Sequence, residues 1–273
     1  MPLSPYQRDV CRLLARNRIA SGESYVAGGA ALNELLRSQR LSRDLDLFHD
    51  SEEALAFSWS ADRTALVEAG YEVRTTRERP TFVEAVVRRS GESVVIQWAQ
   101  DSAFRFFPLV SHEELGLVLH PFDLATSKVL ALVGRVEPRD FIDTLACDRE
   151  VQPFGYLAWA ASGKDPGFSP AAILEHAART VRYTDLELAG LDFEGAPPRA
   201  AELSAVWRAS LARANGIIGL LPGEHVGTAV LTASGDLFRG DNDALRSALA
   251  DGELVFHPGR IRGAFPRVTP MPT

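Results

Sequence analysis

The order of apolar and polar positions predicts helices and strands in alternation at the start of the chain. Helical spacing of apolar residues predicts an amphipathic helix over residues 5–19. Residues 24–27 then form a short apolar run that predicts a strand, and this strand ends at the pair Gly28-Gly29. Residues 30–37 have helical character again, so the glycine pair is predicted to lie at a strand-to-helix turn.

The next predicted strand, residues 45–48, has carboxylates at alternate positions. Asp44 opens this strand, and Asp46 follows two residues later. Successive side chains of a strand point to opposite faces, so these two carboxylates are expected to project from the same face. Asp50 and Glu53 then predict the capped start of a further helix.

The second part of the N-terminal region reads as strands, and the chain becomes largely helical after Pro121. Strands are predicted within residues 71–98, with a hairpin turn at Ser90-Gly91-Glu92, and another short strand over residues 117–119. The later segments that predict helices are residues 123–133, 138–147, 171–179 and 199–214.

The tail predicts a hairpin over residues 228–238 and a short helix over residues 243–250. Together, these patterns predict an α+β fold with two domains. A mixed sheet with flanking helices is expected over residues 1–120, and a mainly helical domain over residues 121–273.

Composition narrows the class of protein. The 273 residues are 46% hydrophobic and 24% charged, which is typical of a globular protein, and the net charge of −7 does not favour a generally basic nucleic-acid binder. No apolar run approaches the roughly 20 residues of a membrane span, and Cys11 and Cys147 read as two separate reduced thiols. We therefore expect a cytoplasmic protein that does not enter a membrane.

Lys128 and Lys164 are the only lysines beside many arginines, which makes their positions worth inspecting.

The glycine turn and the alternating carboxylates together predict a site for nucleotidyl transfer. Gly28 and Gly29 at a helix-opening turn let backbone N–H groups approach phosphate oxygens closely. Asp44 and Asp46, side by side, supply the oxygen ligands that Mg²⁺ prefers, and the phosphates and water complete its coordination. Either feature alone is weak, because most glycine pairs are ordinary turns and most alternating aspartates face solvent.

These residues resemble the polymerase-β-like nucleotidyltransferase superfamily, and within it the AbiEii branch of toxins from toxin–antitoxin and phage-defence systems. That branch has a Gly-Gly-x-x-Leu start, matched in part by Gly28 to Leu32, and an Arg-x-Ser-x-Asp-hydrophobic-Asp element, matched by Arg40 to Asp46. A later helical pair is matched at residues 128–135 and 139–143. The resemblance covers roughly residues 20–148 and implies a nucleotidyltransferase-like mixed sheet, with Gly28, Gly29 and Ser42 cradling phosphate.

Helix geometry also suggests roles for the residues of the later helical pair, independently of the resemblance. Lys128 and Arg135 lie on one face of a predicted helix, about 10 Å apart, which suits Lys128 to a triphosphate and Arg135 to a second anion. Asp140 lies in the first turn of the next helix, and Arg139 and Asp143 have the spacing of an i,i+4 ion pair. Ordinary surface charge and helix capping remain the alternative interpretation.

One position departs from the superfamily pattern. Many members have a third carboxylate on a later strand, and here Gln97 occupies the expected position. Glutamine carries no charge, so Asp140 or Asp143 is expected to orient or activate the acceptor hydroxyl. Glu84 and Asp101 rank lower as substitutes.

The predicted activity is Mg²⁺-dependent transfer of NMP from an NTP to a hydroxyl acceptor. The resemblance implies that the acceptor is tRNA and that a cognate antitoxin protein is a partner. Two alternatives stay open: a small-molecule nucleotidyltransferase of the aminoglycoside type, and a catalytically silent nucleotide-binding module. An arginine cluster near the predicted hairpin fits either an RNA backbone or a charge-protected sheet edge, and consists of Arg74, Arg77, Arg79, Arg88 and Arg89.

Overall fold

The chain folds into two compact units in a computed structural model that describes residues 3–180 and 182–267. Unit 1 consists of Met1–Ala103, Leu109–His120 and Asp192–Gly195. Unit 2 consists of Phe104–Pro108, Pro121–Leu191 and Ala196–Thr273. Among the described residues, no helix has the length and apolar character to cross a membrane.

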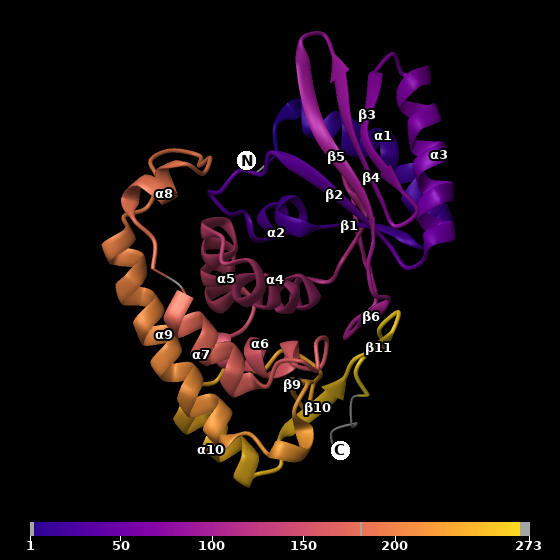
Figure 1. The fold of residues 1–273 in the computed structure, drawn as a ribbon. Helices are drawn as coiled ribbons and strands as arrows, with labels where there is room; N and C mark the ends of the chain where they lie inside the picture. Colours follow the sequence, from indigo (N-terminus) through magenta and orange to yellow (C-terminus); the bar gives the residue numbers. More distant parts are fainter. Residues whose placement is uncertain (1–2, 181, 268–273) are drawn as a thin grey trace. The chain divides into compact units, whose positions relative to one another are not determined.

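Unit 1 is built on a seven-stranded mixed sheet with the strand order β3-β4-β5-β2-β1-β8-β7 (Figure 1). β2 pairs in parallel with β5 and antiparallel with β1, so it lies in the interior of the sheet, where neighbours fix it on both sides. The strands are β1 (Ser24–Ala27), β2 (Asp44–His49), β3 (Glu72–Arg79), β4 (Phe82–Arg89), β5 (Glu92–Gln100), β7 (Val110–His112) and β8 (Gly116–Val118).

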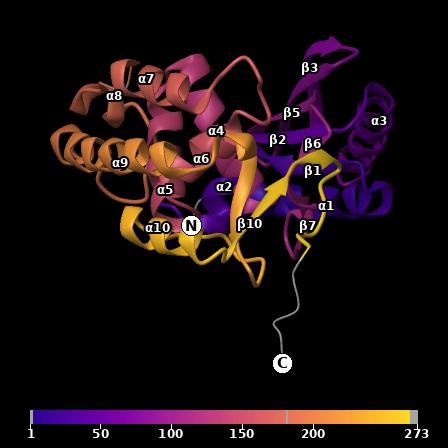
Figure 2. The same cartoon turned by 90° about the horizontal axis from the view of Figure 1, so that it is seen from below.

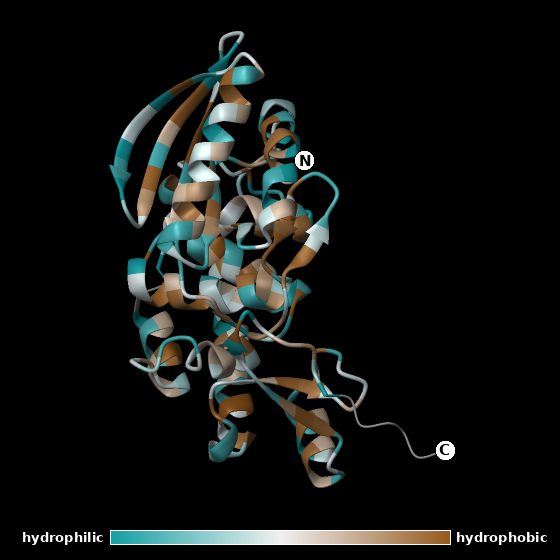
Figure 3. Cartoon of the chain, turned by 90° about the vertical axis from the view of Figure 1, so that its right-hand side faces the viewer, coloured by the Kyte–Doolittle hydropathy of each residue, from teal (hydrophilic) through white to brown (hydrophobic). Residues whose placement is uncertain are grey.

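Two helices, α1 (Pro5–Ser21) and α3 (Glu52–Glu68), lie side by side and cover one face of this sheet (Figure 1). Hydrophobic and hydrophilic positions alternate along the strands, as Figure 3 shows, because one face packs against these helices. Trp98 of β5, for example, is fully buried against Trp59 of α3, with ring centroids 4.7 Å apart. The other helix of this unit, α2 (Gly28–Leu36), follows β1 directly.

The start of α3 differs from the prediction. The Ser51 hydroxyl, not Asp50, accepts a hydrogen bond from the backbone N–H of Ala54 at 3.1 Å and caps the helix. Ser51 has the extended backbone of an N-cap residue, and a helix that begins at Glu52 leaves Asp50 one position too early to cap it.

Unit 2 is mainly helical, and α4, α6, α7 and α9 lie side by side in it (Figures 1 and 2). A two-stranded antiparallel sheet, β9 with β10, packs against α6, and β6 pairs with β11. The helices are α4 (Pro121–Arg135), α5 (Pro138–Glu150), α6 (Phe154–Ala161), α7 (Pro170–Thr180), α8 (Asp185–Ala189), α9 (Ala200–Leu220), the short η1 (Gly223–His225) and α10 (Asn242–Ala250). The strands are β6 (Phe104–Arg105), β9 (Thr228–Thr232), β10 (Leu254–Pro258) and β11 (Arg260–Ile261).

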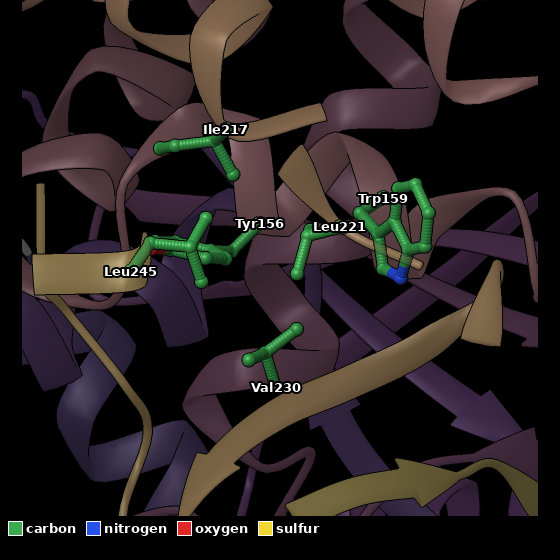
Figure 4. Close-up of a cluster of buried hydrophobic side chains, with 6 residues drawn as sticks. All are labelled: Tyr156, Trp159, Ile217, Leu221, Val230 and Leu245. Atoms are coloured by element: carbon green, nitrogen blue, oxygen red, sulfur yellow. The ribbon is translucent and has the colours of Figure 1, made fainter. Parts of the chain in front are cut away.

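A cluster of buried hydrophobic side chains in unit 2 lies between α6, α9, α10 and the β9–β10 sheet. Tyr156 and Trp159 of α6 pack with side chains of α9, β9 and α10 (Figure 4). Every residue of α6 is buried, so it lacks the amphipathic pattern that identifies a surface helix in a sequence. For this reason α6 was not among the predicted helices. The members of the cluster are Tyr156, Trp159, Ile217, Leu221, Val230 and Leu245.

The predicted hairpin over residues 228–238 is present only as a short turn, in which the backbone N–H of Thr232 donates to the Asp236 carbonyl oxygen at 2.8 Å and that of Phe238 donates to the Val230 carbonyl oxygen at 3.0 Å. β9 does begin at Thr228, but its partner is β10, with Thr228 opposite Pro258 and Thr232 opposite Leu254. Leu231 and Leu237 also form an isolated antiparallel bridge in this turn, but the extended ladder of β9 is with β10. The intervening α10 carries the chain back, which is a non-local pairing that local turn chemistry does not reveal.

His49 supplies a pH-dependent contribution to the stability of unit 1. It is buried on the helix-covered face of β2, where desolvation lowers its pKa from 6.5 to about 4. Below pH 6.5 the unfolded chain therefore binds a proton that the folded chain does not bind until about pH 4. This contribution is complete above pH 6.5 and is lost as the pH falls toward 4.

We expect wild-type protein to lose about 2–3 kcal/mol more stability than His49→Gln between pH 7 and pH 4.5, since one pKa unit is worth about 1.4 kcal/mol. Urea unfolding of both proteins at the two pH values measures the difference. Equal losses of unfolding free energy in the two proteins would show that His49 is not the group that titrates.

Candidate active site

β2 presents the two carboxylates as the sequence predicts. Asp44 and Asp46 are half-buried on one face of the strand, whereas Leu45, Leu47 and His49 are buried on the other face. Both carboxylates are therefore on the face opposite α1 and α3. The Ser42 hydroxyl donates to the Asp44 carbonyl oxygen at 3.2 Å, which shapes the backbone just before the strand.

The glycine turn lies directly against Asp46. Ala27, the last residue of β1, pairs with Asp46 across the antiparallel ladder, and Gly28 follows with a φ of 66°. A Cβ at Gly28 would lie 1.8 Å from Asp46 Oδ2, closer than any side chain permits. Glycine is thus required at position 28 both by its backbone conformation and by the approach of the carboxylate. A Cβ at Gly29 would meet the far end of Arg40 at 2.5 Å and Ser42 Oγ at 3.4 Å.

The start of α2 has the properties of a phosphate cradle. The N-cap residue is Ala27, which has no side-chain oxygen, and no side chain caps this helix end. The first N–H groups of a helix have no partner within the helix, and they carry the positive end of its dipole. Because Gly28 and Gly29 have no side chains, Asp46, Arg40 and Ser42 approach this helix start closely.

Gly28→Ala is expected to lower the free energy of unfolding by about 2 kcal/mol, because it strains the backbone and displaces Asp46. We also expect at least a tenfold loss of nucleotide transfer, since the misplaced carboxylate no longer meets its ligand. Gly22→Ala is the matched control, because Gly22 has a φ of 68° with nothing within 4 Å of its Cβ position. The two variants should share the strain and differ in activity; equal activities would remove the proposed role of the turn.

Gln97 takes the place of a third carboxylate in a row of side chains that crosses the sheet. On β5 it lies opposite Asp46 of β2, and on its other side it lies opposite Glu84 of β4. Gln97 Nε2 donates to Glu84 Oε2 at 3.0 Å. A carboxylate therefore stands in this row after all, one strand further from Asp46 than expected. Asp101 lies beyond the end of β5, where its side chain accepts from the backbone N–H of Ser102.

Unit 2 brings the second set of predicted residues together. The Lys128 ammonium of α4 lies 3.1 Å from Asp140 Oδ1 and 2.9 Å from Asp143 Oδ2, both on α5. Arg135 Nη2 also contacts Asp140 Oδ1 at 3.1 Å. Both carboxylates are fully buried, and the Thr144 hydroxyl donates to the Asp140 carbonyl oxygen at 2.7 Å. Asp140 Oδ2 has no hydrogen-bond partner among the described residues.

The predicted ion pair between Arg139 and Asp143 is wrong. Arg139 instead contacts Glu137 at 2.7 Å, and Asp143 contacts Lys128. The buried Lys128 ammonium outcompetes a half-exposed arginine for this carboxylate, because the burial of Asp143 requires a close cation. Burial next to Asp143 also raises the pKa of the Cys147 thiol, which is free and stays protonated.

Lys164 also pairs with a buried carboxylate of unit 2, a contact that sequence reasoning did not assign. Its ammonium lies 2.9 Å from Asp123 Oδ1, and Asp123 is fully buried. Asp123 also accepts hydrogen bonds from the backbone N–H groups of Phe106 and Phe107 at 2.9 and 3.0 Å. Both lysines of the chain therefore pair with buried carboxylates of unit 2, and their rarity among the basic residues was the available signal.

Lys128→Met and Lys164→Met are each expected to cost about 3–5 kcal/mol of stability, because each leaves a buried carboxylate without its cation. Only Lys128→Met should also weaken NTP binding below the temperature of unfolding, and Lys128→Arg should restore that binding only in part. Calorimetric titration with each NTP, beside thermal unfolding, separates the two effects. Equal losses of NTP affinity in the two variants would assign the effect to general destabilisation.

Asp44 and Asp46 are the two candidate metal ligands. Within residues 3–180 and 182–267 there is no group of three or more histidine, cysteine or acidic side chains arranged to hold a metal ion. Mg²⁺ commonly binds through one or two carboxylates with phosphate oxygens and water. The paired aspartates beside the uncapped start of α2 fit that requirement.

Comparisons with known proteins show which solved structures this fold resembles. No model of a known protein family matches the sequence. No curated protein matches it either. Among solved structures, JHP933 from Helicobacter pylori aligns with a TM-score of 0.47 and 17% identity over 78% of this chain and 95% of that chain. The nucleotidyltransferase toxin MenT4 from Mycobacterium tuberculosis H37Rv aligns with a TM-score of 0.52 and 16% identity over 80% of this chain and 83% of that chain. The predicted mixed α and β fold with flanking helices is confirmed, and the chain shares its fold with the nucleotidyltransferase toxin MenT4.

Proposed function

We propose that the chain is a nucleotidyltransferase that transfers NMP from an NTP to a hydroxyl acceptor and releases pyrophosphate. The observation that carries the proposal is the contact between the helix-opening Gly28 and the Asp46 carboxylate, on a face shared with Asp44. This arrangement brings a phosphate cradle and a pair of metal-binding oxygens together in a fold shared with a nucleotidyltransferase.

In the proposed reaction the acceptor oxygen attacks the α-phosphorus of the NTP. A new P–O bond forms, the bond to the β-phosphate breaks, and pyrophosphate leaves with the bonding electrons. The backbone N–H groups at the start of α2 hold phosphate oxygens, with Gly28, Gly29 and Ser42 forming the cradle. Mg²⁺ bound by Asp44 and Asp46 would neutralise the charge that develops on these oxygens.

The proposal gives the buried cluster of unit 2 the remaining roles. Lys128 neutralises the triphosphate, with Arg135 as a second cation. Asp140 or Asp143 accepts the hydrogen bond, and then the proton, of the acceptor hydroxyl. Asp140 is the stronger candidate, because its Oδ2 has no hydrogen-bond partner within the described residues.

The acceptor we propose is tRNA, which makes the chain a growth-inhibiting toxin with a cognate antitoxin protein as partner. The fold shared with a nucleotidyltransferase toxin supports this choice over the two alternatives, a small-molecule transferase of the aminoglycoside type and a silent nucleotide-binding module.

Incubation with each α-labelled NTP, Mg²⁺ and one acceptor class at a time tests the acceptor. Purified tRNA, total protein and a panel of aminoglycosides are the three classes. We expect label on tRNA. Label on an aminoglycoside would assign the small-molecule function, and NTP binding without any labelled product would assign the silent module.

A further inference from the structure

The edge strand β3 carries three arginines that form no ion pair with another side chain of the described residues. Arg74, Arg77 and Arg79 are all exposed. Within residues 3–180 and 182–267, none of the three forms an ion pair or a side-chain hydrogen bond. β3 is the outermost strand of the seven-stranded sheet, and it is coloured mostly as hydrophilic (Figure 3). These three guanidinium groups are therefore available to an external anion.

A β-bulge places all three arginines on one face. Arg74 and Arg77 are three positions apart, and in a regular strand an odd spacing places two side chains on opposite faces. Here Thr75 lies opposite Ala85 and Arg77 lies opposite Glu84, so Thr76 is an extra residue in β3. The inserted residue returns Arg77 to the face of Arg74, and Arg79 follows at the regular spacing of two.

Hydrogen bonds hold the bulge in place. Thr76 Oγ1 donates to the Glu84 carbonyl oxygen at 3.1 Å and lies 2.7 Å from Glu84 Oε1. Glu84 in turn accepts from Gln97, the residue beside Asp46. A continuous row thus connects the bulge to the candidate metal-binding carboxylates.

The arginine face is the face of Asp44 and Asp46. Across the ladders, Arg77 is in register with Glu84, Gln97 and Asp46, and Arg74 is in register, through Val86 and Val95, with Asp44. Side chains in one row across a sheet share a face. Three strand spacings of about 4.8 Å separate β3 from β2, so the arginines lie about 14 Å from the carboxylates. That distance corresponds to about four nucleotides at 3.4 Å per residue of a helical strand.

Protection of the sheet edge does not explain this arrangement. Charged residues and a bulge at an edge discourage pairing with another strand whichever face the charges occupy. Within β3 the charges are sorted, because Glu78, between Arg77 and Arg79, lies opposite Val83 on the helix-covered face; Glu84 of the neighbouring strand β4 shares the arginine face, opposite Arg77. Glu72 shares the arginine face, but only at the beginning of β3, where it lies opposite Arg88.

We infer that Arg74, Arg77 and Arg79 bind the phosphodiester backbone of a nucleic acid and position its hydroxyl-bearing end toward Asp44 and Asp46. Guanidinium groups bind phosphate through paired hydrogen bonds, and a row of them follows a backbone without reading its sequence. The inference rests on the proposed function for the direction in which the acceptor runs. The arginines position the acceptor and do not touch the reacting atoms.

The test compares two double variants of the full-length chain that each remove two positive charges. Arg74→Gln/Arg77→Gln removes part of the row, and Arg16→Gln/Arg63→Gln removes exposed arginines of α1 and α3, the helices on the other face. Affinities for short RNA and DNA oligonucleotides are measured by fluorescence anisotropy at several salt concentrations. We expect about tenfold weaker binding, with a salt slope reduced by about 1.4 to 1.8, for the first variant alone.

Deletion of Thr76 is a second variant that retains every arginine. Without the extra residue, regular alternation separates Arg74 from Arg77, and we expect a loss of oligonucleotide affinity as large as that of the double variant. Circular dichroism and thermal unfolding verify that the chain still folds. If the deletion prevents folding, Thr76→Val, which removes only the hydrogen bonds to Glu84, takes its place, with at least a threefold loss expected.

The outcomes distinguish this inference from the proposed function. Equal affinities in the two double variants, or no binding of either oligonucleotide by wild-type protein, would overturn the inference. In that case, nucleotide transfer to another acceptor would still support the proposed enzymatic function. Arginine-dependent binding without nucleotide transfer would support the surface and contradict the enzyme. Binding of RNA alone would identify RNA as the source of the phosphates, and equal binding of DNA would identify the backbone in general; either supports the surface.

Discussion

We expect Asp46→Asn to abolish the proposed nucleotide transfer, by at least about 1,000-fold, and to leave the fold unchanged. The amide keeps the shape of the carboxylate but loses the charge that binds Mg²⁺. Because the Asp46 side chain lies on the half-buried face of β2, its loss removes no packing from the hydrophobic core. Transfer of labelled NMP, measured beside circular dichroism and thermal unfolding, tests both parts of the expectation.

Asp44→Asn should behave in the same way, since both carboxylates project from the same face of β2. Leu45→Ile is the control between them, because it changes shape on the buried face without changing charge on the exposed one. If both asparagine variants keep full Mg²⁺-dependent activity, the metal-binding assignment of this strand is wrong.

Asp140→Asn is expected to reduce turnover by about 100-fold to 10,000-fold, the range of general acid–base catalysis, with a much smaller effect on NTP affinity. Asparagine retains an oxygen that can accept the hydrogen bonds from Lys128 and Arg135, so the buried cluster keeps its contacts to Asp140. What disappears is a charged oxygen able to take a proton from the acceptor hydroxyl.

Asp143→Asn and Gln97→Ala are the comparisons for this variant. Asp143 shares the contact with Lys128, so a merely electrostatic role of the cluster would give equal effects at Asp140 and Asp143. Gln97 carries no charge, and its replacement should be mild. Turnover of Asp140→Asn within a few-fold of wild type would remove Asp140 from the mechanism.

The candidate carboxylates and the glycine turn were predictable because their geometry is local. Alternation along one strand puts Asp44 and Asp46 on the same face, and the change from strand to helix at Gly28 is visible within a few residues. The contact between Gly28 and Asp46 follows from the antiparallel pairing of β1 and β2, which no local pattern specifies.

The features that the sequence did not reveal depend on register or on distant partners. Gln97 was placed on the right strand, but the row that joins it to Glu84 depends on the pairing of β4 with β5. The bulge at Thr76 exists only relative to its partner strand, so the common face of the arginines could not be predicted. The pair of Lys164 with Asp123 likewise joins residues far apart in the chain.

The central claim is that Asp46 supports nucleotidyl transfer, and the fate of the α- and γ-phosphates of the NTP tests it most directly. Wild-type protein is incubated with Mg²⁺, tRNA and an NTP labelled at either the α- or the γ-phosphate, beside Asp46→Asn. Nucleotidyl transfer predicts that the α-label becomes bound to tRNA and the γ-label appears in pyrophosphate, with neither product formed by Asp46→Asn. Transfer of the γ-label to an acceptor, or α-label transfer that persists in Asp46→Asn, would contradict the proposed mechanism.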